Sequence, residues 1–260
     1  MGCDLVITST QNEHIKYIRS LGRRRVRQRE GRFVVEGTRL VDEMAREGIR
    51  PALALYTENW AATPEGQRLL PSLAQAQDGC WLVSDQVLTS CADTQTPQGV
   101  LAVAPVVPLP PGEGLILIVD QIRDPGNLGA ILRSAEAAGV GQVLLSPGTV
   151  DVFSPKVVRS AMGAHFRLPV LSLPWAAIAE RVSGRPIWLA DAHGSVDYGH
   201  VDWTQPAALI VGGERAGAGP EAASLATGTV SIPMAGQAES LNAAMAATVL
   251  LFEAARQRRV

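Results

Sequence analysis

The chain is poor in the residues that build metal and redox centres. Only three of its 260 residues are cysteine and four are histidine. Cys3, Cys80 and Cys91 share no spacing typical of a zinc site or a disulfide framework, so the sequence predicts no metal site. Sparse cysteine, and a start that lacks a charged segment followed by an apolar one, favour a reducing, cytoplasmic setting.

The signatures of several large enzyme classes are also missing. There is no Gly-Lys pair, which excludes a phosphate-binding P-loop, and no Gly-x-Ser-x-Gly turn of the kind that carries a hydrolase serine. Gly139 and Gly141 lack a third glycine and precede a strand, which disfavours a nucleotide-dependent oxidoreductase. The apolar tract at residues 241–252 is too short to span a bilayer, so no membrane role is expected.

Proline and glycine are concentrated at residues 105–114, which marks a boundary between two domains. The predicted layout is an N-terminal domain at 1–106, a linker at 107–113 and a C-terminal domain at 114–260. Before the boundary, a helix from about residue 13 and several short strands predict a compact α/β unit. After it, strands and helices alternate, which predicts an α/β fold with a parallel sheet covered on both faces. The C-terminal strands are expected near 115–119, 142–145, 186–190, 207–211 and 229–232, and the helices near 128–138, 155–163, 175–183 and 240–258.

The most informative stretch runs from Asp120 to Arg133, where turn residues join an apolar strand to an amphipathic helix. Gly139 is expected to end that helix. Arg133 lies off its apolar face, on a strip of small residues near the carboxyl end of a strand, where ligands bind in open α/β sheets. The expected core face of the helix consists of Leu128, Ile131, Leu132, Ala135 and Ala138.

Two further strands end in loops that can carry a site. Residues 207–213 break into a glycine-rich loop with one carboxylate, and residues 229–234 lead into a polar loop and a final helix. From 243 to 252 that helix is apolar nearly all round, so it must be covered by the sheet, by other helices or by a second subunit. A site with no evident nucleophile or metal suits the binding and orientation of two reactants.

Positive charge is concentrated near the N-terminus, although the formal net charge is only −2. Residues 14–32 hold eight Lys or Arg against one Glu. Such a block suits a polyanion such as RNA, with a solvated helix face as the alternative. Residues 153–163, which carry Lys156 and Arg159, are expected to be helical and to border the RNA or a subunit interface. The candidate RNA-binding residues are Lys16, Arg23, Arg24, Arg25, Arg27 and Arg39.

Together the three loops resemble the motifs of the SpoU family of RNA 2′-O-ribose methyltransferases, within the SPOUT superfamily. Residues 127–133 match its first motif, 211–217 its second, and 232–234 with 239–243 its third. The match covers roughly residues 114–258. The N-terminal part resembles the small substrate-binding domain, of the L30e/L7Ae-like type, that rRNA-modifying members carry.

The resemblance implies a trefoil knot in the C-terminal domain, S-adenosylmethionine as cofactor, and a homodimer in which both subunits approach one site. It implies that the catalytic residues are Asn127, Arg133, Glu214, Ser240 and Asn242. It implies that the cofactor-binding residues are Gly212, Gly213, Glu214, Gly217, Ile232, Met234 and Leu241. Gly213 departs from the pattern, because many members have asparagine there, so a side-chain contact at 213 must be absent or replaced by backbone or water.

Some of these residues also have structural explanations. Glu214 could accept hydrogen bonds from loop amides, and Ser240 could cap the last helix, with Asn242 close behind it. A guanidinium stays protonated in proteins, so we expect Arg133 to hold an RNA phosphate and stabilise the emerging alkoxide, rather than act as the general base that the family proposal names. His165 is expected to be a packing residue.

The sequence thus predicts an enzyme that methylates a ribose 2′-hydroxyl of RNA. The two-domain layout and the basic N-terminus favour 23S rRNA as its substrate. A tRNA methyltransferase of the same family stays open as an alternative, as does an RNA-binding protein that keeps the fold without activity.

Overall fold

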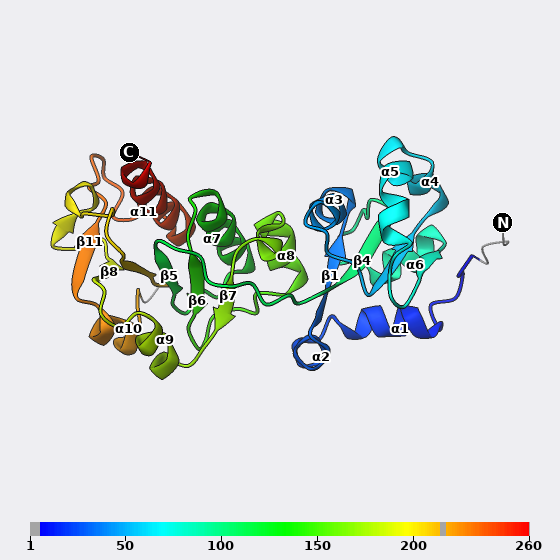
Figure 1. Cartoon of the computed structure of the whole chain (residues 1–260), viewed down its shortest axis with the longest axis horizontal. Helices are drawn as coiled ribbons and strands as arrows, with labels where there is room; N and C mark the ends of the chain where they lie inside the picture. The colour runs from blue at the N-terminus through cyan, green and yellow to red at the C-terminus, as the bar shows by residue number, and fades with distance from the viewer. Residues whose placement is uncertain (1–5, 214–216, 260) are drawn as a thin grey trace. The chain divides into compact units, whose positions relative to one another are not determined.

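The computed structural model describes residues 6–213 and 217–259 and divides into two compact units (Figure 1). Unit 1 comprises Met1–Val107 and Asp151–Phe166, and unit 2 comprises Pro108–Val150 and Arg167–Val260. Unit 1 therefore takes one segment from beyond the proline-rich boundary. No helix within the described residues is long and apolar enough to cross a membrane.

Unit 1 is built on a four-stranded mixed sheet. Its strands are β1 (Arg32–Glu36), β2 (Leu53–Tyr56), β3 (Cys80–Leu82) and β4 (Val100–Pro105), in the order β1-β4-β2-β3. β1 and β2 pair antiparallel with β4, and β3 pairs parallel with β2. Because successive residues of a strand point to opposite faces, the sheet contributes to two separate cores.

Helices cover both faces of this sheet. They are α1 (Glu13–Ser20), α2 (Arg24–Glu30), α3 (Thr38–Arg46), α4 (Glu58–Ala61), α5 (Pro64–Leu73) and α6 (Asp85–Cys91). One core joins Phe33 and Val35 of β1 to the apolar faces of α3 and α5. The other joins Leu53 and Leu55 of β2 to α1 and α6.

Residues 151–166 complete unit 1 with α8 (Pro155–Ala161) and the short 3-10 helix η1 (Ala164–Phe166). Phe166 belongs to the core that holds Phe33, with their ring centroids 6.1 Å apart, and the ring of Phe153 lies 4.9 Å from that of Phe33. These contacts group residues 151–166 with the N-terminal residues. A division of the chain at 107–113 alone does not include this segment in the N-terminal domain.

Unit 2 contains a seven-stranded sheet. Its strands are β5 (Ile116–Val119), β6 (Gln142–Leu145), β7 (Val170–Ser172), β8 (Ile187–Ala190), β9 (Val196–Asp197), β10 (Ala208–Val211) and β11 (Gly228–Ser231). Their order is β7-β6-β5-β10-β8-β11-β9, and every neighbouring pair is parallel. The predicted α/β class with a parallel C-terminal sheet is confirmed. The trefoil knot stays a prediction.

Helices flank this sheet on both sides (Figure 1). They are α7 (Pro125–Ala137), α9 (Trp175–Arg181), α10 (Pro220–Leu225) and α11 (Ala243–Arg258). Ile116 and Ile118 of β5 share a core with side chains of α9 and α10. Leu117 and Val119 alternate with them and therefore face the side of α7 and α11, which pack against each other.

Several short elements were absent from the sequence prediction. The helix expected from residue 13 is divided into α1 and α2. Strands β7 and β9 have three and two residues, and α10 has six, so none is long enough to show a periodic pattern. Helix α11 begins at Ala243, later than the 240 that its apolar run suggested.

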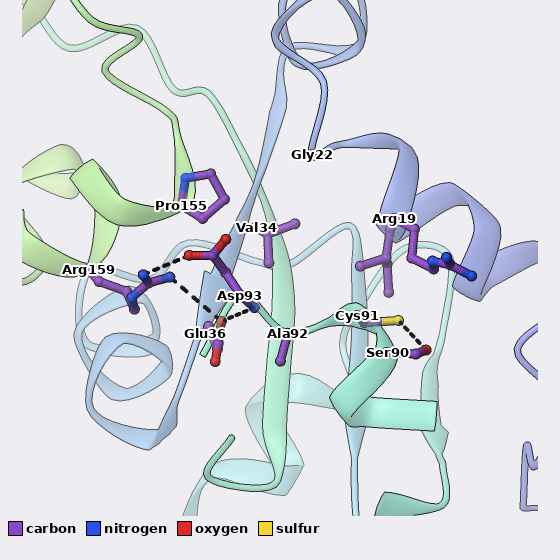
Figure 2. Close-up of a pocket in the computed structure, with 11 residues that line it drawn as sticks. Arg19, Gly22, Val34, Glu36, Ser90, Cys91, Ala92, Asp93, Pro155 and Arg159 are labelled. Carbon is purple, nitrogen blue, oxygen red and sulfur yellow. Dashed lines mark hydrogen bonds and ion pairs between the residues drawn. The ribbon is translucent and has the colours of Figure 1, made fainter. Parts of the chain in front are cut away.

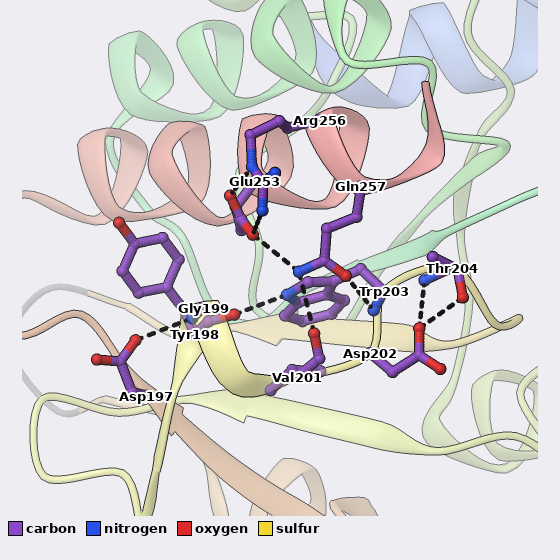
Figure 3. A network of polar contacts seen from close by, with 10 residues as sticks. All are labelled: Asp197, Tyr198, Gly199, Val201, Asp202, Trp203, Thr204, Glu253, Arg256 and Gln257. Carbon is purple, nitrogen blue, oxygen red and sulfur yellow. Dashed lines mark hydrogen bonds and ion pairs between the residues drawn. The ribbon is translucent and has the colours of Figure 1, made fainter. Parts of the chain in front are cut away.

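A polar network joins the end of α11 to the segment before β10 (Figure 3). The Gln257 side chain donates to the Val201 carbonyl (3.1 Å) and accepts the backbone N–H of Trp203 (2.9 Å). The buried Trp203 indole donates to the Tyr198 carbonyl at 3.0 Å. Because these contacts satisfy buried backbone groups, they fix the C-terminal end of α11 on unit 2.

His165 is a packing residue, as predicted. Its Nε2 lies 2.8 Å from the Val152 carbonyl, to which it donates, and its ring lies among those of Phe33 and Phe153. Among the described side chains its Nδ1 has no partner. Burial lowers the pKa of His165 to about 4, although the Val152 carbonyl and nearby Asp151 favour the charged ring.

This shifted pKa predicts acid sensitivity. An unfolded histidine takes up its proton near pH 6.5, whereas the folded one does not until about pH 4, so the free energy of unfolding decreases as the pH falls through this window. Between pH 7 and pH 4.5 we expect a loss of about 2 kcal/mol from His165. In urea unfolding, His165→Gln, which can still donate to Val152 but does not titrate, should lose that much less. Equal losses in the two proteins would refute this assignment.

Candidate active site at the carboxyl edge of the sheet

The first predicted site residue lies in the first turn of α7. Asp124 caps this helix by accepting the backbone N–H of Asn127 at 2.9 Å, and Pro125 occupies the first turn, where a missing N–H costs nothing. The predicted core residues from Leu128 to Ala135 are buried, and Gly139 takes a positive φ of 71° just past the helix. Asn127 is thus held half-buried at the carboxyl end of β5.

The second predicted loop depends on glycine backbone. Gly213 and Gly217 exchange two backbone hydrogen bonds, each 3.0 Å long. A Cβ added to Gly212 would lie 2.5 Å from backbone atoms of Gly217 and Ala218, so no side chain fits at 212. Glu214, predicted to be catalytic and to bind cofactor, lies outside the described residues.

This glycine loop lies against the turn that leads into α7. A Cβ added to Gly213 would lie 3.0 Å from the carbonyl oxygen of Gln121, which would have to move by a few tenths of an ångström. The Gln121 carbonyl therefore occupies the space that a larger residue would need. With glycine at 213, the predicted absence of a side-chain contact at this position holds, and the backbone lies beside the Gln121 carbonyl.

The third predicted loop, residues 232–242, has no helix or strand of its own. Met234 is 37% exposed, and Ser240 is exposed as well. Ile232 and Leu241 are half-buried. After the end of β11, this loop therefore exposes an apolar group at Met234 and a hydroxyl group at Ser240 to solvent.

Asn242 joins the third loop to the first. Its Nδ2 donates to Oδ1 of Asn127 at 3.3 Å, although 115 residues separate the two in sequence. Its own Oδ1 accepts the backbone N–H groups of Ala244 (2.9 Å) and Met245 (3.3 Å), which makes it the N-cap of α11. The alternative of Ser240 as the cap was wrong, because the helix begins two residues later than that role requires.

Arg133 is exposed and makes no hydrogen bond or ion pair within residues 6–213 and 217–259. The next residue, Ser134, faces α11, with its hydroxyl 2.7 Å from that of Thr248. Because successive helical residues are about 100° apart, Arg133 projects to one side of this contact. Its charge is available to a ligand or to a second subunit.

The structure thus gathers elements from all three loops at the carboxyl edge of one parallel sheet. Comparison with known proteins agrees with this arrangement, because a model described as the SpoU rRNA Methylase family matches residues 114–252, which contain all three loops. The chain belongs to the SpoU rRNA methylase family. A second model, the MRM3-like substrate binding domain, matches residues 12–102.

Full-length relatives of this SpoU chain are similar throughout. The 23S rRNA (guanosine(2553)-2'-O)-methyltransferase RlmP of Bacillus subtilis is 33% identical, over 95% of this chain and 97% of that protein. The 23S rRNA (uridine(2479)-2'-O)-methyltransferase of Streptomyces viridochromogenes is 35% identical, over 97% and 92%. The crystal structure of the AdoMet-bound rRNA methyltransferase from Sinorhizobium meliloti superimposes with a TM-score of 0.84 at 31% identity, covering 96% and 97% of the chains.

Most of the predicted RNA-binding cations lie on the surface of unit 1. The exposed ones are Lys16, Arg23, Arg24, Arg25 and Arg39. The basic run therefore forms a solvated positive surface along α1 and α2. Such a surface is consistent with RNA binding and also with a solvated helix face.

Arg27 is a correction to that set. It is only 5% exposed, and its Nη1 donates to the carbonyls of Leu21 (2.6 Å) and Gly22 (2.9 Å). Its Nε and Nη2 both pair with Oδ2 of Asp151, with Nε at 3.1 Å. The guanidinium thus satisfies the end of α1 and holds the 151–166 segment, and it is not available to RNA.

Unit 1 also contains a hollow of about 210 Å³, between α1, α6 and α8 (Figure 2). The Glu36 carboxyl group in its wall accepts the backbone N–H of Asp93 at 2.9 Å, and Arg159 pairs with the Asp93 carboxylate at 2.7 Å. Burial raises the pKa of the Cys91 thiol, so that group is a poor nucleophile. Arg159 is engaged within unit 1 and helps to hold α8 there.

The Arg27 assignment predicts a stability defect where a surface arginine would give a binding defect. Arg27→Met should lower the free energy of unfolding by about 3 kcal/mol, because it leaves a largely buried Asp151 without its partner. The matched variant Arg25→Met removes an exposed cation of the same helix and should change stability by less than about 0.5 kcal/mol. Chemical denaturation measures both. Equal stability of the two variants would contradict the structural role of Arg27.

Proposed function

We propose that this chain transfers a methyl group from S-adenosylmethionine to a ribose 2′-hydroxyl of 23S rRNA. The observation that carries the proposal is the hydrogen bond between Asn127 and Asn242, which brings the first and third family motifs to one edge of the sheet. Full-length similarity to two 23S rRNA 2'-O-methyltransferases supports the substrate. An rRNA substrate in the cytoplasm also agrees with the sparse cysteine content.

The residues of this edge fit S-adenosylmethionine. Gly212 and Gly213 let this segment pack closely against the backbone of Gly217, Ala218 and Gln121, and Met234 offers an exposed apolar side chain to the ligand. An AdoMet-bound rRNA methyltransferase of the same fold, 31% identical, supports this choice. We assign the cofactor to Gly212, Gly213, Glu214, Gly217, Ile232, Met234 and Leu241.

When bound, S-adenosylmethionine would supply a methyl group on a sulfonium: the 2′-oxygen would form the new O–C bond as the C–S bond breaks, S-adenosylhomocysteine would leave with the electron pair of that bond, and the hydroxyl proton would pass to solvent water. Asn127 and Asn242 are held by helix caps and orient the reactants. Arg133 binds the RNA phosphate beside the target ribose and stabilises the developing alkoxide. Ser240 and Glu214 complete the catalytic set.

A homodimer explains two features of unit 2. Arg133 has no partner in its own described chain. Met245 (62% exposed) and Phe252 (42% exposed) lie on one stripe of α11, with half-buried Val249 between them, whereas one face of this helix from Ala243 to Ala255 is buried. A second subunit would cover this apolar stripe and let Arg133 act in the partner's site.

Labelled methyl transfer tests the proposed function. With S-adenosylmethionine labelled in its methyl group, we expect label in 23S rRNA isolated from cells that lack the gene, at one ribose whose 3′ phosphodiester becomes resistant to alkali. The control is Asn242→Asp, because aspartate still caps α11 but has no amide to donate to Asn127. This variant should keep its melting temperature and lose about a hundredfold in rate. Label in tRNA alone, or no transfer to any RNA, would refute the proposal.

Heterodimers test whether Arg133 acts across subunits. Arg133→Ala and Asn242→Asp subunits carrying different tags are co-expressed, and mixed dimers are isolated through both tags. If Arg133 of one subunit serves the site of the other, one of the two sites is intact and the mixed dimer should show about half the wild-type rate. Homodimers of either variant should be inactive. An inactive mixed dimer would place Arg133 and Asn242 in the same subunit's site, and failure to form any dimer would refute the assembly.

A further inference from the structure

Asp120 is a buried acidic residue that the proposed chemistry does not use. It follows directly after β5 and is fully buried. Its Oδ1 accepts the Ser146 hydroxyl at 2.5 Å, and its Oδ2 accepts the backbone N–H of Gly219 at 2.7 Å. Both oxygens are thus occupied by groups from two other segments of unit 2.

Gly219 is the C-terminal end of the glycine-rich loop and the N-cap of α10. A Cβ at this position would lie 2.7 Å from Nε2 of Gln121 and 3.3 Å from Oδ2 of Asp120. The backbone of Gly219 thus lies directly beside the Asp120 and Gln121 side chains. On the other side of the glycine-rich segment, a Cβ on Gly213 would lie 3.0 Å from the Gln121 carbonyl oxygen.

Both ends of the loop are consequently seated on two adjacent residues, Asp120 and Gln121. Gln121 has a positive φ of 52°, which is unusual for a residue other than glycine. Its backbone N–H is held by Ser146 Oγ at 3.3 Å, the same atom that donates to Asp120. Ser146 thus holds Asp120 and the backbone of Gln121, and Asp120 in turn holds the Gly219 amide.

Simple packing does not explain this arrangement. Burying a carboxyl group costs free energy even when both of its oxygens accept hydrogen bonds, and an apolar residue at the end of β5 would avoid that cost. The group is placed where three segments meet: the turn before α7, the end of β6 and the loop with the predicted cofactor residues. Its one contact with the loop is a backbone amide, which it can hold at a fixed distance.

We propose that Asp120, supported by Ser146, is a positioning residue that holds Gly219, and with it residues 217–219 of the glycine-rich segment, in place for the binding of S-adenosylmethionine. This inference depends on the proposed function, because it takes that loop to be the cofactor site. Asp120 acts through the loop backbone and does not touch the reacting atoms.

The test compares cofactor affinity with stability in the full-length protein. Asp120→Ala removes the hydrogen bonds to Ser146 and Gly219. Ser146→Ala removes the hydroxyl that holds Asp120 and the backbone N–H of Gln121. Thr149→Val is the matched control: Thr149 is buried and its hydroxyl donates to the Val119 carbonyl at 3.2 Å, at the same strand end, but it has no hydrogen bond to residues 212–213 or 217–219. Calorimetry measures the Kd for S-adenosylmethionine, thermal melting measures stability, and hydrogen exchange follows the amides of residues 217–219.

We expect Asp120→Ala to raise the cofactor Kd at least tenfold and to speed exchange of the Gly219 amide. Ser146→Ala should raise the Kd about threefold. Thr149→Val should lower the melting temperature and leave both loop measurements unchanged. If Asp120→Ala does not fold, Ser146→Ala decides the matter through the same two readouts.

The proposal would be overturned if Asp120→Ala or Ser146→Ala had both a wild-type Kd for S-adenosylmethionine and wild-type hydrogen exchange of the amides at 217–219. An equal rise in Kd for Thr149→Val would also overturn it, since general weakening of the strand end would then suffice. If the wild-type protein itself does not bind S-adenosylmethionine, the proposed function fails. In that case unchanged exchange of the Gly219 amide in Asp120→Ala would still separately refute the positioning role.

Discussion

The close approach of bare backbone at the end of β10 is the constraint on which the candidate site depends. Gly212 lies so near Gly217 and Ala218 that a Cβ would come within 2.5 Å of their backbone atoms. Gly213 and Gly219 then lie against residues 120 and 121. A side chain at Gly212 would push these backbone segments apart, so the close contact between residues 212–213 and 217–218 depends on glycine.

Helix capping supplies the second constraint, and it shares residues with the proposed chemistry. Asn242 starts α11 with its oxygen and contacts Asn127 with its nitrogen. Asn127 in turn lies in a first turn that Asp124 caps. The Asn242 amide is therefore oriented by the same bonds that begin α11, the backbone of Asn127 is held by the cap of α7, and the two helices pack against each other.

Much of the fold followed from periodicity, because buried strands and helix faces leave regular apolar patterns. Those patterns gave the parallel sheet and the core face of α7 from Leu128 onward. They could not distinguish Arg27 from its exposed neighbours, since its partner Asp151 lies 124 residues away in sequence. The family resemblance predicted roles for Asn127 and Asn242. It gave none for Asp120, whose contact with Gly219 joins residues 99 positions apart in sequence. Periodicity predicts which face of a helix or strand is buried, but it does not predict which distant residue a buried polar side chain contacts.

The segment 151–166 shows why a division by sequence and a division by contacts differ in this family member. Its polar links, Arg27 with Asp151 and Arg159 with Asp93, lie within unit 1, as do the aromatic contacts of Phe153 and Phe166. Residues 1–107 alone would lack these partners and leave the buried Arg27 unpaired. The chain that follows β6 must therefore be present before unit 1 is complete. The stability of the N-terminal unit is consequently linked to residues that the SpoU family model covers.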